Sequence, residues 1–598
     1  MEHLRTKSNR IKKSIKLRGF FSLVAIAIAL SGCNPALFKT QAARVPQLVF
    51  ASPSNPTTFN SPLNQSAFNV FGFIEEGLLT QNGITGELEP ALAESWQISK
   101  DKKRITFTLR EGLKWSDGYP LTADDVVFTY QEIYLNEKIP SSVRDILRIG
   151  TTGKFPSVRK IDERRVEFST PEPFAPFLRF AGGLSILPAH ILQESVRTTD
   201  SNGNLKFLST WGTDTEPKKI IVNGAYRIAS YTPFQRVIFE RNPYYWRKDT
   251  AGNPQPYIKR IVLQIIENTD NQLLSFRSGE LDSFSVTPEA FPLLKREEKR
   301  GKFTIYNGGP ESTTRFLGFN LNKARNHKGQ PFVEPIKSRW FNNLAFRQAV
   351  AYAIDRETMK KNIFRGLADF QNSPIQVQSP YYLSPEKGLK VYNYNPEKAK
   401  ELLLGAGFKY NSSGQLLDWD DNRVQFTLLV KSEEKSRVDM AVQIKNDLSK
   451  IGIQADLQVM SFNTVQERLF SRNWEAYIGA FSGGGIEPHS GFNIWSSQGS
   501  LHQFNQGPQP GEPPISGWEV SDWEKEIDRL FDAGVRELDE NKRKEIYAQF
   551  QQITQEQLPF IYLVNPLSFE AVRERIKNIK FSALGGAFWN IYELQVMQ

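Results

Sequence analysis

Cysteine is almost missing from this sequence of 598 residues, because Cys33 is the only one. A single thiol cannot form a disulfide within the chain. It also leaves the rest of the protein without a cysteine that could act as a nucleophile or a metal ligand. Stability must therefore come from packing, which a chain of this length can provide.

Histidine is scarce as well, and the five residues are scattered along the chain. No two of them have the spacing of paired zinc ligands, so we predict no metal site and no cofactor. His489 stands beside a glycine-rich segment. A lone histidine at such a place is compatible with a metal-binding role and with an ordinary polar surface.

Two motifs of enzymes and nucleotide-binding proteins are also missing. The sequence contains neither GxSxG, the turn that presents a catalytic serine, nor GxxxxGK[ST], the loop that holds phosphate groups. We therefore predict no catalytic residues, and the chain is not expected to be an enzyme or to bind ATP.

The formal charge of +10 is typical of a nucleic-acid-binding protein, but much of it lies in the first 32 residues. That segment carries seven basic residues and one acidic residue, and without it 68 basic residues stand against 64 acidic ones. No lysine-rich stripe with interleaved aromatic residues remains. Nucleic-acid binding is therefore not expected.

The N-terminal segment has the layout of a signal peptide. Basic residues precede an uncharged run over residues 19–32 that is too short to span a bilayer comfortably. The run leads into LSGC, which ends at Cys33 and matches the bacterial lipobox, in which the cysteine is diacylglycerated. We predict a lipoprotein signal peptide over residues 1–32, lipidation of Cys33 and a tether over residues 33–47. A plain secretory peptide or a membrane anchor is the alternative.

Residues 86–130 predict a hairpin followed by a helix. Residues 104–110 alternate polar side chains with isoleucine, phenylalanine and leucine, which is the pattern of a strand with one buried face. Thr122 and Asp125 have the spacing of an N-cap and its reciprocal partner, and apolar residues follow at helical intervals.

Further along, strands and helices are predicted in alternation: strands at 424–430, 453–459 and 474–481, and helices at 436–450 and 464–470. Short connections between such elements imply a mostly parallel sheet, and such sheets bind ligands at the carboxyl ends of their strands. The last strand leads into Ser482 and three consecutive glycines. Glycines there can let a ligand approach the backbone closely, although a flexible turn has the same composition.

Several phrases resemble a known family: LAESW, TFTLREGLKWSDG and PLTADDVVFTY between residues 92 and 130, SGELD at 278, and NLAFRQAVAYAIDR at 343. They are similar to the family 5 extracellular solute-binding proteins, the oligopeptide- and nickel-binding subunits of ATP-binding cassette (ABC) importers. The resemblance covers residues 48–592. It implies an α/β, two-lobed periplasmic-binding-protein fold of type II, of the large cluster with an extra subdomain, with mixed sheets and a two-segment hinge.

The resemblance also implies domain boundaries. We expect lobe I to be built from three segments and to carry a separate smaller subdomain, and lobe II to be continuous. The expected segments are 48–90, 217–310 and 560–598 for lobe I, 91–216 for the subdomain and 311–559 for lobe II.

The resemblance places candidate ligand contacts on both lobes, and for each the alternative is an ordinary place in the core or in a turn. The candidates are Phe68, Asn69, Phe71, Phe462, Phe481, Ser482, Gly483, Gly484, Gly485 and Glu487. Phe462 and Phe481 lie at or just after the carboxyl ends of predicted strands, where parallel sheets bind their ligands. Oligopeptide binders of the family bind the peptide's ammonium group with an aspartate at the position of Gly484. Because a buried ammonium needs a partner, its capture would here require Glu487 or another carboxylate.

The sequence thus predicts a lipid-anchored, monomeric binding protein that captures a peptide or peptide-like solute in the cleft between its lobes. It would deliver the solute to an ABC permease, whose separate ATPase supplies the energy. It would lie outside the cytoplasm, attached to the bacterial membrane by its N-terminal lipid. The alternatives are a secreted enzyme of the peptidase type, and a receptor or chaperone of the same fold that is not coupled to import.

Overall fold

The computed structural model describes residues 46–64, 70–141, 143–150, 153–481, 485–508, 512 and 515–597. The predicted signal peptide, the lipidation site Cys33 and nearly all of the tether lie outside these residues. So do five candidate ligand contacts: Phe68, Asn69, Ser482, Gly483 and Gly484. Within the described ranges, no helix is both long and apolar enough to cross a membrane.

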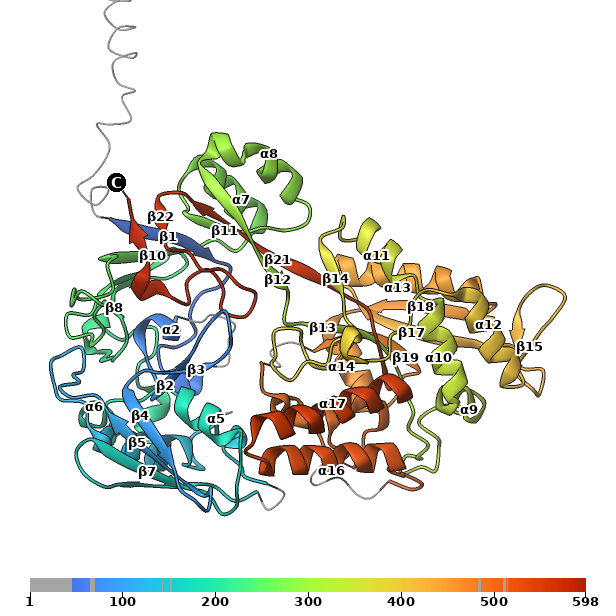
Figure 1. Cartoon of the computed structure of the whole chain (residues 1–598), viewed down its shortest axis with the longest axis horizontal. Coiled ribbons are helices and arrows are strands. Elements are labelled where there is room, and N and C mark those ends of the chain that lie inside the picture. The colour runs from blue at the N-terminus through green and yellow to red at the C-terminus, as the bar shows by residue number, and fades with distance from the viewer. Residues whose placement is uncertain are drawn as a thin grey trace, which may run out of the picture.

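A four-stranded sheet in the order β1-β10-β9-β8 forms the centre of lobe I. β1 (Gln47–Ser52) pairs in parallel with β10 (Arg260–Ile265), as Figure 1 shows. β9 (Arg236–Arg241) and β8 (Tyr226–Thr232) follow in antiparallel order. The second expected segment of lobe I, residues 217–310, thus supplies three strands to the sheet that the first strand begins.

A second four-stranded sheet, β4-β5-β7-β6, lies at the other end of lobe I (Figure 1). The predicted hairpin consists of β4 (Ala93–Ile98) and β5 (Arg104–Leu109), and β5 alternates exposed and buried residues as expected. β7 (Arg165–Ser169) and β6 (Ser157–Lys160) complete the sheet.

Helix α3 (Ala123–Phe128) begins at the predicted capping box. The Thr122 side chain accepts from the backbone N–H of Asp124, and the Asp125 carboxylate accepts from the backbone N–H of Thr122 at 2.9 Å. These bonds satisfy backbone donors that have no partner inside the helix. The chain continues as a wider turn of helix over Thr129–Tyr134.

After the first loop, the spacing of Phe71, Ile74 and Leu78 predicts a helix, and the helix in the structure is shorter. α2 covers only Phe71–Ile74, and Glu75 is already extended, with φ −131°. The backbone N–H of Glu76 donates to the Asn223 side chain at 2.7 Å, so a tertiary hydrogen bond replaces the next helical one. The prediction that this helix runs on to Leu78 is therefore wrong.

A five-stranded sheet in the order β18-β17-β19-β13-β20 forms lobe II. β17 (Gln425–Lys431), β18 (Gln454–Met460) and β19 (Ala476–Phe481) are parallel, as the alternation of strands and helices predicted. β13 (Thr314–Phe319) runs antiparallel to β19, and β20 (Phe560–Tyr562) runs antiparallel to β13. The sheet is therefore mixed.

Helices connect and cover this sheet. The two predicted helices between the parallel strands are α13 (Lys435–Ser449) and α14 (Phe462–Phe470). The other long helices of lobe II are α9 (Pro335–Asn342), α10 (Leu344–Ala353), α12 (Pro396–Gly405), α16 (Asp522–Arg536) and α17 (Glu540–Gln557). α12 begins with an asparagine cap, Asn395, and a proline in the first turn, which is a common signal for the start of a helix.

Two chain segments cross between the lobes. β12 (Phe303–Pro310) leads into β13, and β20 leads into β21 (Val564–Arg573), which pairs with β12. β21 also pairs with β11 (Ser283–Ser285) in lobe I and, at its beginning, with β14 (Ala368–Phe370). Figure 1 shows β21 running from one lobe into the other. The predicted two-segment hinge is present, whereas the exact domain boundaries stay predictions.

Each lobe has its own main hydrophobic core, and Val535 of α16 in lobe II packs in the core of lobe I. One cluster of buried residues joins the sheet of lobe I to its subdomain, and another surrounds the five-stranded sheet of lobe II. A third, smaller cluster lies beneath α7 (Thr269–Ser278) and α8 (Phe291–Gly301). Because Val535 is the one residue of lobe II in the described lobe I cluster, movement of the lobes relative to each other would leave the rest of both main cores intact.

Candidate functional site

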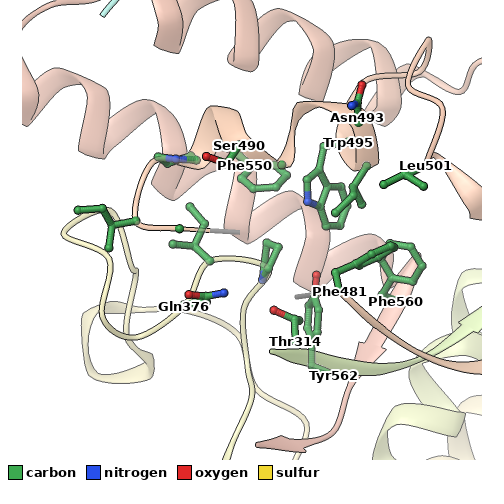
Figure 2. Close-up of a pocket in the computed structure, with 17 residues that line it drawn as sticks. Thr314, Gln376, Phe481, Ser490, Asn493, Trp495, Leu501, Phe550, Phe560 and Tyr562 are labelled. Atoms are coloured by element: carbon green, nitrogen blue, oxygen red, sulfur yellow. The ribbon is translucent and has the colours of Figure 1, made fainter. Parts of the chain in front are cut away.

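A cavity of about 180 Å³ lies in lobe II, next to both chain crossings. Thr314 begins β13 after the first crossing, and Tyr562 ends β20 before the second. Phe481 ends β19 and lies opposite Thr314 in the sheet. All three line the cavity, which Figure 2 shows in close-up. It thus lies at the carboxyl ends of β19 and β20, which is where sheets with parallel strands bind their ligands.

Aromatic rings form one wall of the cavity. Phe481 stacks on Phe316 with ring centres 4.9 Å apart. Trp495 meets Phe550 edge-on at 5.0 Å and Phe560 edge-on at 5.7 Å. Each of these contacts restrains the rings that it joins. The wall is therefore formed before any ligand arrives.

The polar side chains of the cavity carry no charge. They belong to Thr314, Gln376, Ser490, Asn493 and Tyr562. The Tyr562 hydroxyl is buried, has no hydrogen-bond partner in the described structure, and points into the cavity in Figure 2. Burial raises the pKa of Tyr562 well above its ordinary value, so the phenol stays neutral.

The loop that begins at residue 485 forms another wall. Gly485 has φ +52°, in the left-handed region that glycine adopts without strain. The carbonyl of Ile486 accepts from the Ser379 hydroxyl at 2.6 Å, which ties the loop to lobe II. Of the predicted ligand contacts, Gly485 and Phe481 therefore line the cavity.

Glu487 lies in the same loop but forms a buried ion pair. Its carboxylate accepts from the Arg543 guanidinium at 2.6 Å, and both side chains are almost fully buried. Burial lowers the pKa of Arg543, but the Glu487 carboxylate raises it more, so the net shift is upward. A role for Glu487 in binding a ligand ammonium stays a prediction, and it would require this pair to open.

His489 packs between the lobes. Its ring lies edge-on to Phe174 of lobe I at 5.2 Å and beside Phe492 at 5.1 Å. Burial, followed by the charge of Arg543, lowers the pKa of His489 to about 4. The interpretation as an ordinary polar surface residue does not hold. Among the described residues, no three His, Cys, Asp or Glu side chains gather in a way that could hold a metal.

The lobes touch in a region that we call the interlobe contact, formed by residues 172–175 of lobe I with 487–489 and 535–536 of lobe II. The N–H of Ala175 donates to the carbonyl of Val535 at 2.7 Å, and Arg536 pairs with Glu172 at 3.4 Å. Figure 1 shows α5 (Phe177–Gly183) beside the ends of α16 and α17. The lobes are therefore in direct contact on this side.

Phe71 and Phe462 lie elsewhere. Phe462 begins α14 and is 47% exposed, and the Lys431 ammonium lies over its ring at 5.8 Å. Phe71 begins α2 and is half-buried against the core of lobe I. Neither is among the described residues that line the cavity. Their roles as ligand contacts stay predictions.

Sequence reasoning missed several cavity residues. The patterns of residues 541–555 and 558–564 predict a helix with Phe550 and a strand with Phe560, but their spacing does not distinguish a cavity wall from a core. Gln376 lies in a segment without periodicity and gave no signal. Tyr562 could have been found, because the pattern of residues 558–564 predicts a strand beside the expected hinge, and Tyr562 is a polar aromatic residue within it.

Comparisons with known proteins agree with this architecture. Residues 87–502 match the family model described as "Bacterial extracellular solute-binding proteins, family 5 Middle". A Deinococcus radiodurans protein named "Probable ABC transporter-binding protein" is 28% identical over 542 residues, 87% of each chain. The dipeptide-binding protein of Escherichia coli (strain K12) is 25% identical over 591 residues, 96% of this chain and 97% of that one. The solved structure of the oligopeptide-binding protein AppA from Bacillus subtilis in complex with a nonapeptide has a TM-score of 0.64 and 23% identity, covering 92% of this chain and 99% of that chain.

Proposed function

The chain belongs to the bacterial extracellular solute-binding proteins of family 5, and on this premise we propose that it captures a peptide or peptide-like solute between its lobes for an ABC importer. The observation that supports this most directly is the cavity at the ends of β13, β19 and β20, beside both crossings. A solute there would touch the segments about which the lobes turn. Binding would therefore change the balance between open and closed forms.

We further propose how the protein is held and used. Removal of residues 1–32 would leave Cys33 as a lipidated N-terminus, and the body would lie outside the cytoplasm as an anchored monomer. The closed, loaded form would be the one that the permease recognises, while a separate ATPase drives transport. The lipobox and the family membership support this proposal, and its work would be binding without catalysis.

The predicted contacts differ in how well they are placed. Phe481 and Gly485 line the cavity and are the first candidates to touch the solute. We keep Phe71, Phe462 and Glu487 as contacts to parts of a solute that extend beyond the cavity. Phe68, Asn69, Ser482, Gly483 and Gly484 remain proposals from the sequence alone.

Small-angle X-ray scattering of the chain from residue 33 onward tests the proposal. We expect a mixture of free tripeptides and acetylated, amidated tripeptides to reduce the radius of gyration, because a ligand held by both lobes favours the closed form. An unchanged radius would contradict the proposal. Mass spectrometry of the same mixture tests the rival function, because cleaved peptides would indicate a peptidase.

Two phenylalanine variants test where the solute binds. Phe481→Ala should weaken binding of the peptides that bind the unchanged protein by about tenfold. This is the equivalent of roughly 1.4 kcal/mol of lost ring contact. Phe470→Ala removes the same side chain from an exposed position outside the cavity, at the end of α14, and should leave the affinity unchanged. Titration calorimetry measures both, and equal losses would place the solute elsewhere in the cleft.

A further inference from the structure

The cavity has a property that narrows the class of solute. None of the described residues that line it carries a charged side chain. Eleven of its 17 lining residues, with Tyr562 among them, are aliphatic, aromatic or proline residues, and its polar groups are hydroxyls and amides. Ligand pockets of this kind bind the apolar body of a ligand and orient it with a few neutral hydrogen bonds.

The charged side chains nearest to the cavity in the sequence are already paired. Glu487 is bound by Arg543 at 2.6 Å, inside the protein. Arg315 follows Thr314 in β13, so its side chain points to the opposite face of the sheet. There it pairs with Glu311 at 3.3 Å and with Glu434 at 3.4 Å. None of these groups is free to neutralise a charge on a solute without breaking an existing pair.

A charged solute group would therefore be costly in this cavity. An ammonium or carboxylate that leaves water without a partner of opposite charge loses several kcal/mol of solvation. A neutral ring loses little, and it gains contact with Trp495, Phe481 and Phe560.

The cavity also offers one specific hydrogen bond. The Tyr562 side chain is 3% exposed, and its hydroxyl lacks a partner while it points into the cavity (Figure 2). A buried hydroxyl without a partner costs free energy, which a ligand group that bonds to it would recover. A carbonyl or hydroxyl on the solute meets this requirement without carrying a charge.

We propose that this cavity selects an uncharged, ring-bearing end of a peptide-like solute, such as a terminally blocked or cyclic peptide, and rejects a free ammonium or carboxylate terminus. The ring would pack on Trp495 and Phe481, and a neutral oxygen of the solute would bond to Tyr562. This inference rests on the proposed function and names the class of solute for the same site.

A competition experiment tests the selection. The chain from residue 33 onward is incubated with equal amounts of two tripeptide libraries rich in tryptophan and phenylalanine, one free and one acetylated and amidated. Native mass spectrometry then identifies the retained peptides. We expect the blocked peptides to be retained by at least about tenfold over the free ones, because only the free ones bring charges into the cavity.

Preferential or equal retention of free peptides would overturn the inference and leave the proposed function standing. Retention of neither library would count against the proposed function itself and so against the inference.

Variants place the selection in the cavity. Tyr562→Phe removes only the hydroxyl and should weaken binding of blocked peptides by about fivefold to tenfold. Tyr547→Phe is the matched control, because that tyrosine is also buried but lies outside the cavity lining, and its change should have no effect on the affinity. Equal behaviour of the two variants would overturn the assignment of Tyr562.

A third variant reverses the preference. Asn493→Asp adds a carboxylate of nearly the same shape to the cavity lining and should shift retention toward peptides with a free ammonium group. Asn446→Asp makes the same change on an exposed position of α13 and should not. If Asn493→Asp leaves the preference for blocked peptides unchanged, the cavity does not control the selection.

Discussion

One loop separates two regions of opposite chemistry. Gly485, Ile486 and Pro488 line the cavity, whereas Glu487 and His489, which alternate with them, enter the buried region next to lobe I. The cavity contains neutral polar groups, among them the buried hydroxyl of Tyr562, which has no partner in the described structure. The neighbouring region contains an ion pair in which each charge already has its partner. Charge in this part of the protein stabilises its structure, and the surface left for a solute is neutral.

The largest expected effect comes from breaking the ion pair. Arg543→Met leaves the Glu487 carboxylate buried without its partner and should lower the free energy of unfolding by about 3–5 kcal/mol. Urea denaturation followed by tryptophan fluorescence measures this change. A loss below about 1 kcal/mol would show that the pair does not stabilise the loop.

A double variant is the control for this experiment. Glu487→Gln combined with Arg543→Met removes both charges, so no unpaired charge stays buried. It should recover much of the stability that the single variant loses, as expected for two directly coupled residues. If the double variant lost as much free energy of unfolding as the two single variants together, a direct interaction between Glu487 and Arg543 would be contradicted.

The next effect is a pH dependence that belongs to the interlobe contact and not to the cavity. The pKa of His489 is lowered to about 4 in the structure, below the ordinary value of 6.5, so the unfolded or opened state binds more protons between these values. The contribution of neutral His489 to the free energy of unfolding is complete above pH 6.5 and is lost as the pH falls toward 4. At pH 5.5 the loss should be about 1.4 kcal/mol.

A neutral replacement isolates this titration. His489→Phe keeps a ring against Phe174 but cannot bind a proton. The difference in unfolding free energy between the protein and this variant should change between pH 7.5 and pH 5, and other titrating groups cancel in that difference. A difference that is constant with pH would contradict the placement of His489 in a buried contact.

The smallest effect is expected at the rim of the interlobe contact. Arg536 pairs with Glu172 at 3.4 Å, and both side chains are partly exposed. Arg536→Ala should favour the open form by only about 0.5 kcal/mol, and added salt should remove the difference. Energy transfer between one dye on each lobe measures this shift. Arg529→Ala, which breaks a pair within α16 itself, should leave the transfer efficiency unchanged.

Much of the fold could be predicted because it depends on patterns of residues that are close together in the sequence. The capping box at Thr122 and the alternation of strands and helices in lobe II are formed by residues close together in the sequence. The prediction failed at α2, where the side chain of Asn223 takes the backbone N–H that a longer helix would have used. A hydrogen bond between residues so far apart leaves no trace in a local pattern.

The candidate site was predictable only in part for the same reason. Phe481 and Gly485 could be placed at the cavity because they follow the end of a strand. Glu487 carries the same local signal but is turned toward Arg543, a partner from a distant helix. The sequence shows that a residue follows a strand, and it does not show which way the side chain turns.

By itself the sequence determined the family, the alternation of elements and the absence of a second cysteine, because these depend on residue identity and on spacing along the chain. Only the tertiary structure decided which side chains meet at the site. Thr314, Gln376, Trp495 and Tyr562 reach one cavity because two crossings and the order of five strands bring their segments together. The cavity is neutral only in the folded protein, because Glu487 and Arg315 point away from it toward charged partners that are distant in the sequence.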